Sequence, residues 1–339
     1  MTADTVPMST KSLFGNTTRT TLRPRYEGSN ICTWIGFKHV NYLVEEAVLE
    51  HFRGAGLPAR TLFEELGLGL DIVDLDTRIL HALHMDDLVD AEVVPATKEG
   101  DPVLVFKVTL SLERDGQPVK AVASKVKVSL RPADYLRSAA EPPAELAPFA
   151  VARLGAHLPD RQVVPVAAPA DNTALSQGRG TTAADPVLEQ LTEGDNAFGW
   201  KWRIPYPYCH FTERLQMSGY LRQMEEVVDL FLADRGISIK QLLDDRKWIP
   251  VVPHSRIQIL DEALMEEDLY TVYTVEGVFK DFTYTSRMDC YVVRDCRLVQ
   301  TATGRITHGY ALIESRRDWR LVNFDDRVVR ALNGEPTAG

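Results

Sequence analysis

Two short loops, one in each half of the chain, carry polar side chains just before a long apolar segment. The first loop contains Asn30 in "SNICTWIGF", and the second contains His210 in "PYCHFTERL". A histidine has an unperturbed pKa of about 6.5 and can therefore transfer protons at neutral pH. An asparagine cannot act as a base, but its amide NH₂ can donate a hydrogen bond to an oxyanion. The simpler alternatives are a loop asparagine that satisfies backbone groups and a histidine that packs in a core.

A pair of adjacent glutamates follows each loop, as "EEAV" from Glu45 and as "EEVV" from Glu225. Adjacent residues on a helix point about 100° apart, so at most one of each pair can face a pocket. A carboxylate held against apolar surroundings has a raised pKa and can serve as an acid or a base. We therefore take Glu46 and Glu226 as catalytic candidates, with solvation or ion pairing as the alternative.

Three further side chains near these positions are candidates for substrate binding. Tyr42 and Tyr220 lie in the apolar segments, and Glu213 follows His210 by three residues. Glu213 has a second interpretation, because an acidic residue just before a helix can cap its positive end.

Other chemistries lack a motif. There is no H-x-x-x-H or cysteine–histidine cluster, so we expect no metal site. Cys32 and Cys209 lie near the two loops, but neither has a local nucleophile motif, and a free cysteine is usually a small packing residue. G-x-S-x-G, P-loop and Rossmann signatures are also missing, so we expect no separate cofactor.

The two halves of the chain repeat at one fixed offset, which is the separation between Glu45 and Glu225. At this offset "EEAV" at Glu45 matches "EEVV" at Glu225, and Arg114-Asp115 matches Arg294-Asp295. The same offset places His210 where the first half has Asn30. One supersecondary unit used twice explains the pattern.

Each repeat reads as one long buried helix followed by antiparallel strands. Helical periodicity covers 37–53, where Gly54 and Gly56 end it, and 219–233 in the second half. Strand patterns follow at 71–80, 88–96, 103–113 and 119–130, and at 255–260, 269–278, 283–293 and 297–313. This order predicts an α+β fold, a double hotdog with two antiparallel sheets, each wrapped around a long central helix.

Composition sets the domain boundaries. The N-terminal residues are rich in Thr, Ser and Arg, which predicts a flexible tail over 1–24, with a transit peptide as the alternative. Pro, Ala, Gly and Thr accumulate between the repeats, which predicts a linker over 136–197. The hotdogs are then expected at 25–135 and 198–330.

The opening stretch "YEGSNICTWIGFKHVNYLVEEAVLEHFRGAGL" resembles thioesterase-type hotdog proteins. It is similar to enediyne-type polyketide thioesterases and to the N-terminal half of plant acyl-carrier-protein thioesterases. The resemblance implies an acyl-thioester substrate, with a loop Asp or Asn acting on the thioester and each site built from both halves. Asn30 matches the family's position, and the usual Asp is absent at both loops. That departure favours His210 as the chemical centre.

The bulk properties limit the partners. The formal net charge is −10, which argues against a nucleic-acid partner. No apolar run is long enough to span a bilayer, and four cysteines without a C-x-x-C pair favour a reducing cytoplasm. Two hotdogs in one chain allow either a monomer or a homodimer of the doubled unit.

The leading interpretation is hydrolysis of an acyl-carrier-protein or acyl-CoA thioester in polyketide or fatty-acid-like biosynthesis. CoA or phosphopantetheine would enter only as part of the substrate. A dehydratase and an acyltransferase/decarboxylase on the same scaffold are the first alternatives. A binding protein that holds an acyl or polyketide group without converting it is the second.

Overall fold

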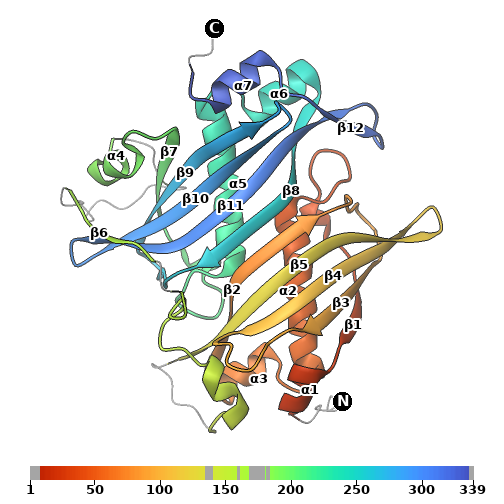
Figure 1. Ribbon diagram of the computed structural model, residues 1–339, viewed down its shortest axis with the longest axis vertical. Coiled ribbons are helices and arrows are strands. Elements are labelled where there is room, and N and C mark those ends of the chain that lie inside the picture. Colours follow the sequence, from red (N-terminus) through yellow and green to blue (C-terminus); the bar gives the residue numbers. More distant parts are fainter. Residues whose placement is uncertain (1–7, 134–139, 159–160, 168–179, 181–183, 336–339) are drawn as a thin grey trace. The chain divides into compact units, whose positions relative to one another are not determined.

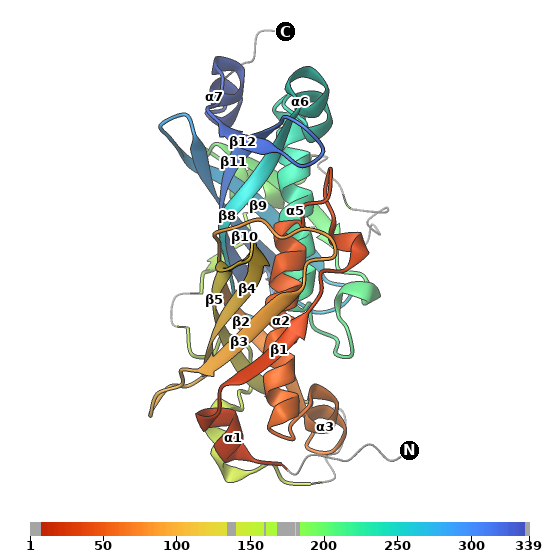
Figure 2. The same cartoon turned by 90° about the vertical axis from the view of Figure 1, so that its right-hand side faces the viewer.

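The computed structural model describes residues 8–133, 140–158, 161–167, 180 and 184–335. The chain divides into two compact units, Met1–His157 and Leu158–Gly339, called here the N-terminal and C-terminal units (Figure 1). Each unit has one long helix that lies on one face of an antiparallel sheet, as the side view in Figure 2 also shows. This architecture confirms the predicted α+β class.

The sheet of the N-terminal unit has the order β1-β3-β4-β5-β2. Its strands are β1 (Thr18–Leu22), β2 (Leu68–Ile79), β3 (Val89–Pro95), β4 (Leu104–Arg114) and β5 (Gln117–Pro132). The long helix α2 (Phe37–Gly54) packs on this sheet, and two short helices, α1 (Thr10–Gly15) and α3 (Ala59–Glu64), flank it. Side chains of β4 alternate between buried and accessible, as expected for a strand with one face on a core.

The sheet of the C-terminal unit has the order β8-β11-β10-β9-β7. Its strands are β7 (Ala197–Arg203), β8 (Trp248–Ile259), β9 (Asp268–Phe279), β10 (Thr283–Arg294) and β11 (Arg297–Ile313). Two further short strands, β6 (Val163–Pro165) and β12 (Trp319–Val322), pair with β11. The helices are α4 (Pro186–Thr192), the long α5 (Met217–Asp234), α6 (Ile239–Arg246) and α7 (Asp326–Leu332).

The repeat extends to small details of the backbone. Helices α2 and α5 both contain 18 residues, and their starts are related by the same offset as the repeated glutamates. The register shift between Leu110 and Ser111 recurs between Cys290 and Tyr291. Both β4–β5 and β10–β11 turn through two residues with positive φ, Asp115-Gly116 and Asp295-Cys296. Such mirror-image turns match the twist of a two-stranded hairpin.

The N-terminal boundary differs from the prediction. Residues 10–22, expected in a tail over 1–24, form α1 and β1, and β1 pairs with β3. Ser9 caps α1, and Leu13 is fully buried. Strand pairing and one buried leucine hold this polar segment in the unit, which composition alone could not reveal. Residues 1–7 lie outside the described part.

The segment between the repeats also contains ordered elements. Within the predicted linker 136–197, a 3₁₀ helix, η2 (Ala144–Phe149), packs on β5, and β6 pairs with β11. Helix α4 buries Val187 and Leu188 in an apolar cluster with residues of β9, β10 and β11. Segments 134–139, 159–160, 168–179 and 181–183 lie outside the described residues.

Strand β8 begins at Trp248, seven residues before the predicted start at 255. Pro250 and Pro253 interrupt the strand pattern in the sequence, because proline has no N–H to donate to a ladder. The structure accommodates Pro253 at a bulge, where the register with β11 shifts between Thr307 and Gly309.

Candidate active site

The loop that carries His210 connects β7 to α5 and begins with a 3₁₀ helix, η3 (Tyr206–Tyr208). Backbone hydrogen bonds fasten it to the loop between β8 and β9. Leu215 N–H donates to the carbonyl of Ala263 (2.8 Å), and Met265 N–H donates to that of Glu213 (2.7 Å). The segment that follows His210 is therefore held in place by a second loop of the same unit.

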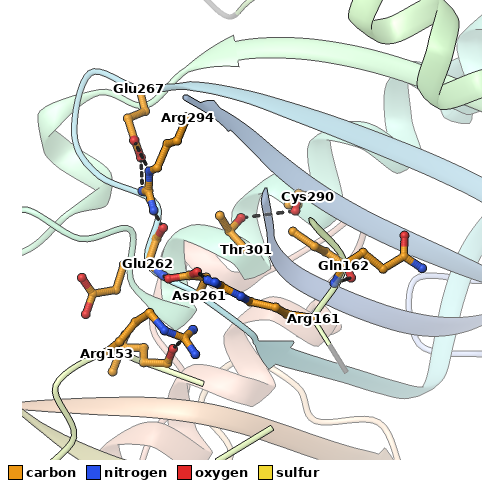
Figure 3. Close-up of polar contacts among 11 residues, drawn as sticks. Arg153, Arg161, Gln162, Asp261, Glu262, Glu267, Cys290, Arg294 and Thr301 are labelled. Carbon is orange, nitrogen blue, oxygen red and sulfur yellow. Dashed lines mark hydrogen bonds and ion pairs between the residues drawn. The ribbon is translucent and has the colours of Figure 1, made fainter. Parts of the chain in front are cut away.

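Arg294 anchors that second loop, as Figure 3 shows. Its Nε and Nη2 donate to the two carboxylate oxygens of Glu267, at 2.7 Å each, and Nη2 also donates to the backbone carbonyl of Glu262 at 2.8 Å. The carboxylate raises the pKa of Arg294 above its ordinary value. Arg161 pairs with Asp261 at the start of the same loop. These pairs fix the support on which the His210 loop rests.

His210 has a left-handed backbone, with φ of 48°. Such a conformation is uncommon for a residue other than glycine, although histidine adopts it more readily than most side chains. The residue is exposed, yet protein atoms around the ring shield it from water and lower the pKa of His210. Positively charged Arg222 lowers that pKa further. The imidazole is therefore neutral at pH 7 and able to accept a proton.

The ring of His210 is hydrogen bonded to the start of α5. Its Nε2 lies 2.6 Å from Oγ of Ser218, the second residue of the helix. Ser218 itself is buried, with 5% of its surface exposed. Packing is tight here, because a Cβ at Gly219 would lie 2.5 Å from Leu215 Cδ1 and 3.1 Å from the carbonyl oxygen of Tyr208. The glycine therefore lets the loop approach the helix.

The first turn of α5 has no side-chain cap. The N-cap residue Gln216 makes no capping hydrogen bond, and its Nε2 donates to Thr212 Oγ1 at 2.7 Å instead. The first N–H groups of a helix carry partial positive charge and favour an anion. The arrangement thus places a base, a hydroxyl and oriented N–H donors at one helix start.

The loop of the N-terminal unit makes the same backbone contacts. Ile35 N–H donates to Leu83 (2.8 Å), and Met85 N–H donates to Thr33 (2.9 Å), which are the contacts of Leu215 and Met265 at the repeat offset. Asn30 is exposed, and its side chain lies over Gly36, where a Cβ would come within 2.9 Å of Asn30 Oδ1. Asn30 and His210 therefore lie at matching positions of the repeat, each in its own unit, but their backbones differ. Asn30 N–H donates to the carbonyl of Trp34 at 2.7 Å, and of the two residues only His210 has a positive φ.

The two glutamate candidates lie farther along the helices. Glu46 accepts a 2.7 Å hydrogen bond from Arg53, and Glu226 is half-buried on α5. Eight residues separate Ser218 from Glu226, a rise of about 12 Å along the helix axis. The structure therefore does not bring Glu226 to the hydrogen-bonded pair of His210 and Ser218.

The substrate-binding candidates have different surroundings. Tyr42 is half-buried on α2 and stacks edge-on against His39, and Glu213 is exposed in the loop and does not cap α5. Tyr220 is fully buried in the core of the C-terminal unit, and burial raises the pKa of its hydroxyl. The substrate-binding role of Tyr42, Glu213 and Tyr220 stays a prediction.

Two residues escaped the sequence reasoning, and one alternative loses support. Ser218 and Arg222 come to His210 only because the loop folds back over α5, and neither belongs to a recognisable motif. Cys209 is fully buried, and burial raises the pKa of its thiol to about 11, so it is no thiolate nucleophile.

Neither a metal site nor a membrane-spanning helix is found among the described residues. No three His, Cys, Asp or Glu side chains gather as a possible metal site in the described part of the chain. In the same part, no helix is long and apolar enough to cross a membrane.

Comparison with known proteins supports the architecture. No protein-family profile and no curated protein sequence matches the chain. Among solved structures, one assigned as an oleoyl thioesterase from Lactobacillus plantarum superposes with a TM-score of 0.55 at 11% identity, covering 88% of this chain and 98% of the other. The 12:0-ACP thioesterase from Umbellularia californica superposes with a TM-score of 0.54 at 12% identity, covering 91% of this chain and 98% of the other.

A third structure, an acyl-ACP thioesterase from Bacteroides thetaiotaomicron VPI-5482, gives a TM-score of 0.51 at 8% identity, covering 86% and 97%. Identities this low show the fold and leave the reaction open. With its two helix-on-sheet units and this likeness over most of its length, the chain has the thioesterase-like double-hotdog fold.

Proposed function

We propose that this protein hydrolyses an acyl thioester and that His210 is the general base. One observation carries the proposal: the His210 imidazole, with its pKa lowered by its surroundings, is held by a left-handed backbone at the uncapped start of α5. A neutral imidazole can remove a proton from the attacking oxygen and later protonate the leaving thiolate. Oriented N–H groups of the helix start are suited to the oxyanion that forms on the thioester carbonyl.

Asn30 is proposed to have a different task. Its loop makes the same backbone contacts but offers an amide in place of a base, so it can donate a hydrogen bond and cannot take a proton. We propose that Asn30, in the loop of the N-terminal unit, binds the substrate by donating a hydrogen bond to a carbonyl or amide group. Glu226 would act on a part of the substrate away from His210, and the catalytic role of Glu46 stays a prediction.

An acyl group on an acyl carrier protein or on CoA is the proposed substrate class, in polyketide or fatty-acid-like biosynthesis. Two of the similar structures are named as acyl-ACP thioesterases, which supports a carrier-bound thioester. CoA or phosphopantetheine would then be part of the substrate, with no other cofactor. A cytoplasmic enzyme, acting as a monomer or a homodimer, fits this assignment.

Thiol release measured with a thiol-reactive dye tests the proposal. Acyl-CoA esters of increasing chain length and the same acyl groups on a carrier protein form the substrate panel. We expect release of free acid and thiol, and a loss of about 10²–10⁴-fold in kcat for His210→Ala, the usual contribution of a general base. Full activity of His210→Ala would refute its role.

The products separate the alternatives. Loss of water with the thioester intact would identify a dehydratase. Thiol release with the acyl group moved to a second acceptor, or with CO₂ lost, would identify an acyltransferase/decarboxylase. Tight binding without any product would identify a binding protein. Each of these results would replace thioester hydrolysis as the function.

A further inference from the structure

We propose that Ser218 is the nucleophile of this reaction and that its hydroxyl oxygen carries the acyl group in a covalent intermediate. The inference rests on the hydrolysis proposed above and specifies which group attacks the thioester. Ser218 Oγ lies 2.6 Å from His210 Nε2, within the reach that an activated nucleophile needs from its base. The fold of the loop over the helix start joins the two side chains.

The position of Ser218 on α5 supports attack rather than capping. Serine near a helix start usually accepts a hydrogen bond from a backbone N–H. Here the N-cap position is Gln216, and Ser218 lies two residues inside the helix, where its Oγ is hydrogen bonded to His210. A carbonyl carbon bound to this oxygen would have its oxyanion beside the first N–H groups of the same helix.

The equivalent place in the N-terminal unit cannot support the same step. The repeat offset puts Asn30 at the place of His210 and Lys38 at the place of Ser218. Neither of these two positions offers an imidazole base or a hydroxyl. The loops agree in the backbone contacts to their supporting loops but differ in the two groups that covalent catalysis needs, which assigns the step to the C-terminal unit alone.

The pair is a dyad. Among the described residues, no acidic side chain hydrogen bonds the other ring nitrogen of His210. In a triad, a third group orients the base. Here the left-handed backbone of His210 and the close packing at Gly219 orient the imidazole. Dyads of this kind activate a hydroxyl without an acid partner when the base is otherwise held in place.

The reaction has two balanced steps. Nε2 of His210 accepts the hydroxyl proton while Ser218 Oγ bonds to the thioester carbon. The C–S bond then breaks, and the thiolate takes that proton from the imidazolium. Water attacks the resulting ester, His210 takes the water proton and returns it to Ser218 Oγ, and the free acid leaves. One thioester and one water become one acid and one thiol, with both residues regenerated.

The partition of the acyl group between water and methanol tests the intermediate. Octanoyl-CoA and octanoyl-N-acetylcysteamine are hydrolysed by the wild-type protein in the same methanol–water mixture. A common acyl-enzyme gives the same ratio of methyl ester to free acid from both, because the leaving thiol has already departed. Different ratios would mean direct attack on the thioester and would overturn the proposal.

Variants locate the acyl group. In acid-quenched wild-type samples, we expect an octanoyl adduct at Ser218 in peptide mass spectra. Ser218→Cys is expected to show the adduct as a thioester. Ser218→Ala is expected to show no adduct and a kcat lower by at least about 100-fold. Ser238→Ala is the matched control, because Ser238 is a helix-start hydroxyl that accepts from Gln241 N–H at 3.3 Å. Ser218→Ala with nearly full kcat, or an adduct elsewhere, would overturn the proposal.

A separate probe distinguishes failure of this inference from failure of the proposed function. Diisopropyl fluorophosphate phosphorylates activated serines and needs no thioester. Labelling of Ser218 in the wild type and not in His210→Ala would confirm the dyad even if no tested thioester were hydrolysed. Hydrolysis without labelling of Ser218 would leave the proposed function standing and remove the nucleophile. Circular dichroism melting checks that each variant is folded.

Discussion

The sheet core of the N-terminal unit contains Leu104, Val128 and Leu130. The C-terminal unit has Tyr284, His308 and Tyr310 at the equivalent positions. All six side chains are at most 2% exposed. The strand pairs agree as well, since Leu104 faces Val128 and Tyr284 faces His308. One backbone plan therefore contains an aliphatic core in one unit and an aromatic, polar core in the other.

Several buried polar atoms of the C-terminal unit make no well-formed hydrogen bond with the described residues. The hydroxyls of Tyr273, Tyr284, Ser286 and Tyr310 and Nδ1 of His308 have no hydrogen-bond partner among the described residues. Tyr273 lies near Tyr284 and Ser286 without making a well-formed hydrogen bond. Each buried, unsatisfied polar group costs about 1–3 kcal/mol. The C-terminal unit thus carries a stability penalty that its twin avoids at these positions.

One buried polar network of the N-terminal unit is fully paired. Asn41 donates to the carbonyl of Phe37 and accepts from Thr77 Oγ1, which also bonds Ser124. Every member of this network has a partner. The comparison teaches that a repeated backbone fixes where side chains meet, and that each copy can then diverge toward its own task. The buried hydroxyls and the His308 imidazole, which lower the free energy of unfolding, lie in the same unit as His210, where function can outweigh stability.

The largest effect is expected at the two loops. His210→Ala should lower kcat by about 10²–10⁴-fold, whereas Asn30→Ala should change kcat by less than about tenfold, because only His210 can transfer a proton. Because the pKa of His210 lies below its ordinary value, wild-type activity should fall only below about pH 6.5. Steady-state rates across pH check both points. A larger loss for Asn30→Ala would place the chemistry in the N-terminal unit.

The core histidine should make stability depend on pH. Burial lowers the pKa of His308 from 6.5 to about 3. Between these values the unfolded chain binds the proton and the folded chain does not, so the free energy of unfolding should fall by about 1.4 kcal/mol per pH unit as the pH drops below 6.5. His308→Val, which copies Val128 of the other unit, should remove this contribution. Urea unfolding at pH 7 and pH 5 measures the free energy of unfolding of both proteins. An equal change in this free energy between the two pH values for the wild type and His308→Val would contradict the prediction.

The loop supports should also differ in consequence. Arg294→Met breaks the bidentate pair with Glu267, and Arg114→Met breaks the matching pair with Asp87. Each should lower the free energy of unfolding by about 1–3 kcal/mol, as for hydrogen bonds to charged groups. Only Arg294→Met should also lower kcat, since its loop supports His210. Equal kinetic losses in both variants would show that the loops contribute alike.

The smallest effect concerns one hydroxyl. Tyr284→Phe removes a buried group without a protein partner, so the free energy of unfolding should rise by about 1 kcal/mol. Tyr26→Phe is the control, because Tyr26 is 84% exposed and should change nothing measurable. Chemical denaturation compares the two variants. An unchanged or lower stability for Tyr284→Phe would mean that this hydroxyl is satisfied in solution.

Much of the fold could be predicted because its signals are local. The predicted strand 297–313 coincides with β11, and the predicted helix 37–53 differs from α2 by one residue. Periodicity and turn residues act over a few neighbours, so a single sequence exposes them. The polar segments around β1 and β6 were missed because their order comes from pairing with distant strands, which leaves no local pattern.

The candidate site was predictable only in part. His210 and Asn30 stand out by residue type and by the repeat, and the structure places them at matching positions of the repeat. Ser218 could not be found, because a serine in a helix has no signature until the loop brings a histidine to it.

The sequence by itself determined the doubled plan of one long helix and its strands, through a single repeat offset and local periodicities. Only the tertiary structure decided that Ser218 meets His210 and that Cys209 is buried. It also decided that the rings of Tyr284 and His308 stack with their centroids 4.9 Å apart, where the Tyr284 hydroxyl and His308 Nδ1 have no hydrogen-bond partner among the described residues. Such contacts depend on how loops and strands close in space, which sequence spacing does not encode.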